Sequence, residues 1–165
     1  SKPFVAILMG SDSDLPVMQS TLDVLNGLGV SYEVNILSAH RTPEQTKAYI
    51  VDAESRGCLV FIAAAGLAAH LAGVVAAHTL KPVIGVPMDG GPLKGMDALL
   101  STVQMPGGVP VATVAIGKAG DKNAGYLAAQ ILSVADGALA KKLIDERAQN
   151  AQVILAKNAE LKGKL

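Results

Sequence analysis

Residues 4–14 decide the fold of this chain, and they read FVAILMGSDSD. Apolar residues run without a break up to Gly10, and small polar residues follow. A strand that is buried on both faces of a parallel sheet has this continuous apolar character, whereas a strand with one wet face alternates. Ser13 or Asp14 then suits the cap of a helix, with Pro16 in its first turn. The stretch therefore predicts a strand, a loop and a helix, the unit from which α/β folds are built.

The same unit recurs along the chain. Further segments of strand length and strand-like composition occupy residues 30–37, 58–63, 83–86 and 111–116. Helical patterns follow from Thr42 to about Gly57, and then at about 67–78, 97–104 and 121–134. The first of these begins with the capping-box sequence Thr42-Pro43-Glu44-Gln45. This alternation predicts right-handed crossovers and an α/β fold of three layers, an αβα sandwich with a central parallel sheet, in a single domain over residues 1–165.

Residues 137–165 depart from this alternation. The segment is polar with a helical pattern, and its apolar residues lie only partly on one stripe. Every predicted strand is already covered, so this C-terminal helical extension has no strand of its own to pack against. We expect it to pack on a neighbouring subunit; the alternative is the edge of its own domain.

The composition excludes several classes of protein. Hydrophobic residues make up 50% of the 165 residues and charged residues only 17%, which is unlike a disordered chain or a coiled coil. Lys and Arg number 14, Asp and Glu also number 14, and no long basic run occurs, so we expect no nucleic-acid partner. The single cysteine, Cys58, excludes an internal disulfide and a cysteine-based metal site, and we expect it to be a small buried side chain.

One stretch has the length of a membrane span. Between Cys58 and Ala77 only His70 interrupts twenty otherwise apolar or small residues. Because alanine and glycine make up most of it, we interpret the stretch as a buried strand, a loop and a helix, and expect no membrane partner. Since Ser1-Lys2-Pro3 leads into the first strand without a cleavage pattern, we expect a cytoplasmic location.

Ligands of open parallel sheets bind beyond the carboxyl ends of the strands, near the point where the strand order reverses. The loops predicted at that edge span residues 10–14, 38–41, 64–70, 87–95 and 117–121. The first loop offers two hydroxyls and two carboxylates, the second offers a serine, a histidine and an arginine, and both lead into a helix. Backbone amides at two helix N-termini, together with hydroxyls and a guanidinium, predict a site for one small anion, of which a phosphate is the best match.

Some of these residues also have a plain structural interpretation. Ser11, Ser13 and Asp14 are residue types that turns and helix caps use for their own backbone. Arg41 has the alternative of being an exposed charge near a helix start, but a cation there opposes the helix dipole. That local misfit favours a ligand for the guanidinium.

The three histidines differ in their surroundings. His40 lies between Ser38 and Arg41 at a strand end, which favours acid–base use over a loop histidine bonded to backbone. His70 is equally well explained as a satisfied buried histidine and as a ligand contact, and we interpret His78, farther along the same predicted helix, as structural. Their spacing fits no metal site, and the loops match neither a P-loop nor a dinucleotide fingerprint, so no metal, ATP or NAD is predicted.

From the residues alone, then, the site takes a small phosphorylated metabolite and has a histidine for proton transfer. Two of its loops carry a more specific pattern, since residues 9–14 read MGSDSD and residues 38–43 read SAHRTP. They resemble the class I N5-carboxyaminoimidazole ribonucleotide mutases of de novo purine synthesis. The stretches AAHL at 68–71, STVQMPGGVPVAT at 101–113 and the run at 123–132 agree with the same family.

The resemblance implies a flavodoxin-like α/β fold, assembled as a homo-octamer, that needs no cofactor, metal or ATP. It implies an isomerase that moves a carboxyl group from the exocyclic nitrogen of its ribonucleotide substrate to a ring carbon, giving 4-carboxy-5-aminoimidazole ribonucleotide. His40 matches the catalytic acid–base position. The positions implied to bind the substrate are Ser11, Ser13, Asp14, Ser38, Arg41 and His70.

The chain departs from the family at two positions near His70. Leu67 stands where the family's Gly-Gly-Ala-Ala-His-Leu-Pro-Gly stretch has its second glycine, and Ala72 stands in place of the proline. These changes bear on the shape of the carboxylate pocket. Two alternatives to the mutase stay open: a class II carboxylase that uses free CO2, which resembles this chain less well because it lacks the AAHL run, and a non-catalytic module that binds a phosphorylated metabolite.

The implied reaction has a simple chemical route. Protonated His40 donates to the departing nitrogen as CO2 leaves, and the ring carbon then attacks the trapped CO2 and loses its proton to neutral His40. Trapping requires a closed, water-poor chamber, which the small residues 64–69 suit, with Gly90 and Gly91 closing over it.

Overall fold

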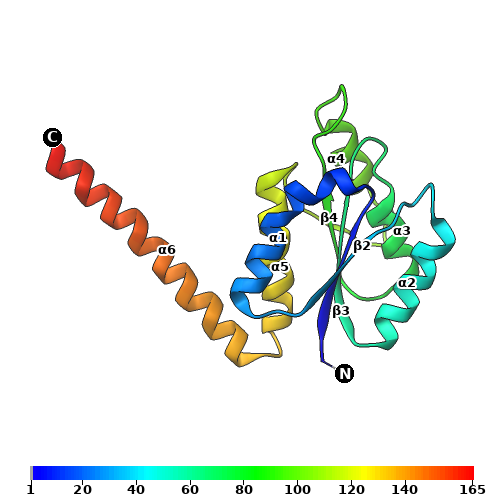
Figure 1. The fold of residues 1–165 in the computed structure, drawn as a ribbon, viewed down its shortest axis with the longest axis horizontal. Helices are drawn as coiled ribbons and strands as arrows, with labels where there is room; N and C mark the ends of the chain where they lie inside the picture. The colour runs from blue at the N-terminus through cyan, green and yellow to red at the C-terminus, as the bar shows by residue number, and fades with distance from the viewer. Residues whose placement is uncertain (1) are drawn as a thin grey trace.

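Five parallel strands form the central sheet. The computed structural model describes residues 2–165, and the strand order is β2-β1-β3-β4-β5 (Figure 1). The strands are β1 (Phe4–Met9), β2 (Tyr32–Ile36), β3 (Cys58–Ala65), β4 (Val83–Pro87) and β5 (Ala112–Thr113). The helices are the 3-10 turn η1 (Asp12–Asp14), α1 (Leu15–Leu28), α2 (Pro43–Ser55), α3 (Leu71–His78), α4 (Met96–Val103), α5 (Lys118–Ser133) and α6 (Gly137–Lys164). This is the flavodoxin-like order, and it confirms the predicted αβα sandwich with a C-terminal helix.

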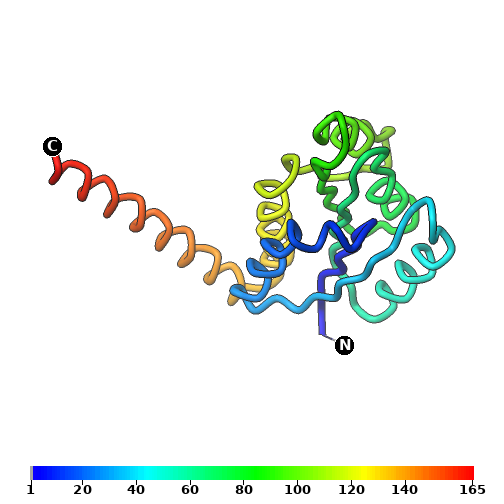
Figure 2. The backbone as a smooth tube through the Cα atoms, turned by 45° about the horizontal axis from the view of Figure 1, so that its top comes forward, coloured from blue at the N-terminus to red at the C-terminus, as the bar shows by residue number. Residues whose placement is uncertain are grey.

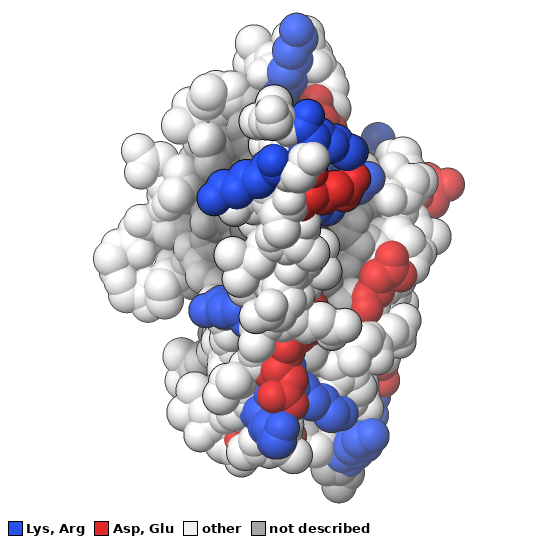
Figure 3. All heavy atoms as spheres, turned by 90° about the vertical axis from the view of Figure 1, so that its left-hand side faces the viewer, with Lys and Arg blue, Asp and Glu red and all other residues white. Residues whose placement is uncertain are grey.

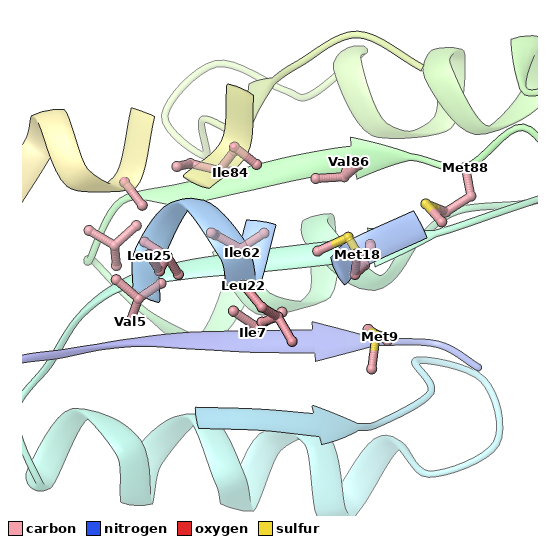
Figure 4. Packing of buried hydrophobic residues seen from close by; sticks show 14 residues of the cluster. Val5, Ile7, Met9, Met18, Leu22, Leu25, Ile62, Ile84, Val86 and Met88 are labelled. Atoms are coloured by element: carbon pink, nitrogen blue, oxygen red, sulfur yellow. The ribbon is translucent and has the colours of Figure 1, made fainter. Parts of the chain in front are cut away.

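Helices cover both faces of the sheet, α1 and α5 on one and α2 and α3 on the other (Figure 1). Val5, Ile7 and Met9 of β1 pack on the side of α1 (Figure 4), and the residues between them pack on the side of α2 and α3. All residues of β1 are buried. Two dry faces are the reason why this strand reads as an unbroken apolar run.

Small residues allow close approach between the layers. A Cβ on Gly125 of α5 would lie 3.1 Å from Val24 Cβ and 3.2 Å from the Thr21 carbonyl oxygen of α1. Gly85 of β4 is tighter still, because a Cβ there would collide with Thr102 of α4. α4 therefore lies against β4 at a distance that leaves room only for a hydrogen atom.

The third helix is shorter than the sequence predicts. α3 begins at Leu71 rather than near residue 67, since residues 66–70 form a loop instead of the first helical turn. The Ala69 N–H of this loop donates to Ser101 Oγ of α4 at 2.9 Å. A contact with another element thus replaces the local helical hydrogen bonding.

The last strand and the helix after it also differ from the prediction. β5 pairs with β4 only at Ala112–Thr113, not over residues 111–116, because at the sheet edge no further strand holds the chain in the ladder. Gly117, with φ 71°, then starts α5 earlier than expected, at Lys118. The earlier start places Asp121 in the first turn of α5.

The C-terminal helix leaves the body of the domain. Its beginning docks through Leu139, which packs with Val24, Leu28 and Ala129. Every residue from 147 to 165 is exposed, and the helix projects away from the sandwich (Figures 1 and 2). Exposed ion pairs, Lys141 with Asp145 and Lys164 with Glu160, each join one turn of α6 to the next. Figure 3 views the molecule from the side on which α6 projects, and basic and acidic side chains are interspersed there. Packing of this helix on a neighbouring subunit stays a prediction.

Asp121 is a buried carboxyl between α1 and α5. Thr21 Oγ1 donates to the Asp121 backbone carbonyl at 2.7 Å and also contacts Oδ1, while Oδ2 has no hydrogen-bond partner among residues 2–165. Burial raises the pKa of Asp121, and hydrogen bonding to Thr21 and Ser20 opposes this shift. The unfolded pKa of an aspartate is about 3.9, so stability is full below that pH and is lost as the pH rises toward the higher pKa of the folded state.

We expect Asp121→Asn to flatten this pH dependence. Above about pH 4, Asp121 releases its proton in the unfolded state but keeps it in the folded state, so the free energy of unfolding falls as the pH rises. Asparagine has no such proton, so this contribution is absent in the variant. Urea unfolding at a series of pH values measures the difference. Asp145→Asn, on the exposed surface of α6, is the control and should follow the native curve. Parallel curves for the native chain and Asp121→Asn would contradict the expectation.

Candidate active site

Four loops at the carboxyl edge of the sheet line one cavity. Its volume is about 640 Å³, and its walls are the loops after β1, β2, β3 and β4. The cavity adjoins β1 and β3, where the strand order reverses, which is the usual ligand position in open parallel sheets. The predicted site residues that line it are Ser11, Ser13, Asp14, Ser38, His40, Arg41 and His70. The loop at 117–121, also a candidate from the sequence, is not part of its lining.

The loop after β1 provides hydroxyls and one carboxyl. Ser11 Oγ accepts from the Ser13 N–H at 3.3 Å and lies 3.0 Å from Ser13 Oγ, so Ser11 does cap the short turn η1. Asp14 occupies the cap position of α1, yet its side chain makes no capping hydrogen bond. Burial raises the pKa of Asp14; hydrogen bonding to the Ser11 backbone opposes this shift, and the charge of Asp12 adds to it. The cavity wall therefore has a partly desolvated carboxyl that makes no capping bond to α1.

The loop after β2 is held by its own serine and threonine. Thr42 Oγ1 accepts from the Ser38 N–H at 2.9 Å, and Ser38 Oγ accepts from the Arg41 N–H at 3.1 Å. The Thr42 side chain makes no capping hydrogen bond to α2, so the expected capping box is wrong, and its threonine fixes the loop instead. Within residues 2–165 the Arg41 guanidinium has no hydrogen bond or ion pair. The loop thus presents a rigid backbone with a free cation.

Two imidazoles meet across the cavity. His40 Nε2 lies 2.7 Å from His70 Nδ1, and the rings are edge to face, with centroids 4.8 Å apart and an interplanar angle of 90°. At this distance one of the two nitrogens donates a hydrogen bond to the other, and either ring can be the donor. His40 Nδ1 and His70 Nε2 are left for a ligand. Both side chains are exposed, so His70 is not the satisfied buried histidine that the sequence allowed, and His40 is bonded to His70 rather than to backbone.

Other residues of the cavity carry no signal in the sequence. Met88 and Asp89 line it, and the Met88 N–H donates to the Ala65 carbonyl at 2.9 Å, which extends the β3–β4 ladder into the loops. The loop at 87–95 was a candidate because of its length and glycines, but nothing marks Asp89 among its residues. Ser101 does not line the cavity but holds the loop after β3, and it was missed as well, since this contact depends on where α4 lies.

Cys58 and His78, which the sequence kept out of the site, lie outside the cavity. Cys58 is buried, and burial raises the pKa of its thiol to about 11, which keeps it unreactive. His78 is exposed at the end of α3 and does not line the cavity. In the part of the chain that the structure describes, no three His, Cys, Asp or Glu side chains gather as metal ligands. None of the helices described has both the length and the apolar character needed to span a membrane.

Comparison with known proteins agrees with this geometry. The model of the AIR carboxylase family matches residues 4–153. The N5-carboxyaminoimidazole ribonucleotide mutase of Bacillus subtilis is 54% identical over 97% of this chain and 99% of its own length. The mutase of Thermotoga maritima is 52% identical over 96% of this chain and 92% of its own. Among solved structures, Treponema denticola PurE superposes with a TM-score of 0.88 at 32% identity, covering 98% of this chain and 99% of that one.

Proposed function

Since this chain belongs to the AIR carboxylase family, we propose that it is an isomerase that converts N5-carboxyaminoimidazole ribonucleotide into 4-carboxy-5-aminoimidazole ribonucleotide in purine biosynthesis. The observation that carries the proposal is the contact between His40 and His70 inside a cavity that also holds the free Arg41 guanidinium. A proton-transfer group beside an anion-binding group is what rearrangement of a phosphorylated ribonucleotide requires.

The reaction balances without a co-reactant. The bond between the carboxyl carbon and the exocyclic nitrogen breaks, its electron pair stays on nitrogen, and nitrogen takes a proton from the His40 imidazolium as CO2 is released. The ring carbon then attacks CO2, and the ring proton passes to His40, which is restored to its starting form. His70 holds His40 Nε2, so that Nδ1 is the nitrogen aimed at the substrate.

Substrate binding falls to the loops after β1 and β2. Arg41 pairs with the phosphate, together with backbone N–H groups at the starts of α1 and α2. The hydroxyls of Ser11, Ser13 and Ser38 lie around the same cavity and supply further hydrogen bonds. Asp14 accepts from a substrate hydroxyl, a role supported by the absence of a capping bond to its side chain.

One assay separates this proposal from its rivals. The N-carboxylated ribonucleotide is supplied without ATP or added metal, and its conversion is followed by absorbance. Conversion supports the mutase. Turnover only with aminoimidazole ribonucleotide and bicarbonate would show the direct carboxylase, and binding without a change in absorbance would show a non-catalytic module.

The exposed end of α6 supports an assembly. We propose a homo-octamer in which residues 137–165 pack on a neighbouring subunit, because the apolar side chains of Val153, Ile154 and Leu155 are 49%, 62% and 57% exposed in the single chain. Sedimentation analysis of the native chain and of Ile154→Glu tests this, and a native monomer would refute it.

The charge of the phosphorylated substrate keeps it from crossing membranes, which favours the proposed cytoplasmic location.

The partner of His40 has a measurable role in this mechanism. We expect His70→Ala, which removes the nitrogen that His40 Nε2 contacts, to lower kcat about tenfold, the value of one hydrogen bond to a charged group, with little change in KM and an altered pH profile of kcat. His70→Asn keeps an amide oxygen near the position of His70 Nδ1, so it offers an acceptor to His40 Nε2 and should recover part of the loss. Native kcat and an unchanged pH profile in His70→Ala would argue against any role for the pair.

A further inference from the structure

The loop after β3 contains a strained residue at the cavity. Leu67 has φ 58°, in the left-handed region, and within residues 2–165 the only other non-glycine residue with positive φ is Lys94. For a residue with a Cβ this conformation costs about 1–2 kcal/mol. Strain of this kind persists where the surroundings impose it, and it is found often at ligand sites. Leu67 also stands where the family pattern has a glycine, which adopts such a φ freely.

The Leu67 side chain reaches across to the loop after β4. Gly91 of that loop has φ 83°, and a Cβ on Gly91 would collide with Leu67 Cδ2. The leucine side chain thus rests on bare backbone of the opposite loop. Both residues line the cavity, and 55% of Leu67 is still exposed. An apolar contact therefore joins two walls of the cavity at its surface.

The two loops differ in how their middle parts are held. The loop that carries Leu67 is tied to α4, because the Ala69 N–H donates to Ser101 Oγ at 2.9 Å. The loop at 88–95 is anchored at its start, where the Met88 N–H donates to the Ala65 carbonyl at 2.9 Å, whereas the backbone of Gly91 accepts one long hydrogen bond, from the Lys94 N–H at 3.3 Å. Leu67 is therefore the support, and the segment around Gly91 is the part of the loop whose position depends on it.

We propose that Leu67 is a positioning residue that seals the cavity while CO2 is free in it. CO2 is small and uncharged, so no ion pair retains it, and its retention depends on closed walls. Leu67 keeps Gly91 and its loop over the cavity, and the exposed part of its side chain is the apolar surface against which the loop closes. The inference rests on the proposed function, because a seal matters only when a carboxyl group is released and recaptured.

The test measures where the carboxyl group goes. The N-carboxylated ribonucleotide is turned over in 13C-bicarbonate buffer by the native chain, by Leu67→Gly and by Leu67→Ala. The glycine variant removes both side chain and strain, and the alanine variant removes the side chain alone. We expect both to release several-fold more aminoimidazole ribonucleotide and to incorporate several-fold more 13C than the native chain. Affinity for 4-carboxy-5-aminoimidazole ribonucleotide should change by less than about tenfold.

Leu93→Ala is the matched control. Leu93 is an exposed leucine of the loop at 88–95 that does not line the cavity, and its loss should leave the partition native. A native partition in both Leu67 variants would overturn the proposal and leave Leu67 as a packing residue. If the native chain makes no product at all, the proposed function fails, and this inference fails with it. That result is distinct from one in which the native chain turns over and the Leu67 variants release no more aminoimidazole ribonucleotide than it does.

Discussion

Replacement of His40 by asparagine is expected to lower turnover by at least about a hundredfold while ligand affinity stays within roughly tenfold. Asparagine keeps a polar group of similar size, but it does not exchange a proton near neutral pH. In the proposed mechanism His40 gives a proton to nitrogen and later takes one from the ring carbon, so both chemical steps lose their catalyst. Steady-state kinetics with the N-carboxylated ribonucleotide and calorimetric titration with the product measure the two quantities.

His78 provides the matched control for this variant. It is a histidine exposed at the end of α3 and outside the cavity, so His78→Asn should keep native kinetics and native affinity. Full activity in His40→Asn would remove His40 from the mechanism. A loss of affinity well beyond tenfold, with turnover of bound substrate unchanged, would make His40 a binding residue instead.

Arg41→Ala is expected to raise KM about ten- to hundredfold, with a smaller change in kcat. A hydrogen bond to a charged group contributes about 1.5–3 kcal/mol, and each 1.4 kcal/mol is a tenfold change in affinity. The guanidinium has no partner within the described residues, so its removal takes nothing from the stability of the fold. Inhibition by ribose 5-phosphate, which carries the phosphate without the base, should weaken by a similar factor.

Lys47→Ala controls for the loss of positive charge, because Lys47 is exposed on α2 and does not line the cavity. Arg41→Lys should recover only part of the affinity, since an ammonium does not form the two parallel hydrogen bonds of a guanidinium. An unchanged KM in Arg41→Ala would place the phosphate elsewhere in the cavity.

The sheet was predictable because its central strands are dry on both faces. The run at residues 4–9 has no alternation to misinterpret, and all of its residues are buried. The prediction was wrong where long-range contacts replace local ones. At 67–78 the sequence looks helical throughout, but Ser101 takes the Ala69 N–H, and the first turn is a loop.

The residues of the cavity were predictable by loop, but their contacts were not. Strand ends of a parallel sheet meet at one edge, so the chemistry-bearing loops after β1 and β2 were expected at the same edge. The contact between His40 and His70 depends on the exact turn of two loops, for which no sequence spacing gives a rule. The strain at Leu67 is likewise visible only in the backbone.

Gly85 of β4 does not line the cavity, yet its lack of a side chain affects the cavity through α4. A Cβ at that position would collide with Thr102 of α4, and the same helix supplies the Ser101 hydroxyl that holds the loop leading to His70. The alignment of the two imidazoles thus depends on the position of α4, and α4 can lie this close to β4 only because residue 85 has no side chain. In a saturation mutagenesis screen, position 85 should therefore group with His40 and His70 in its effect on turnover, although it lies in the interior of a strand.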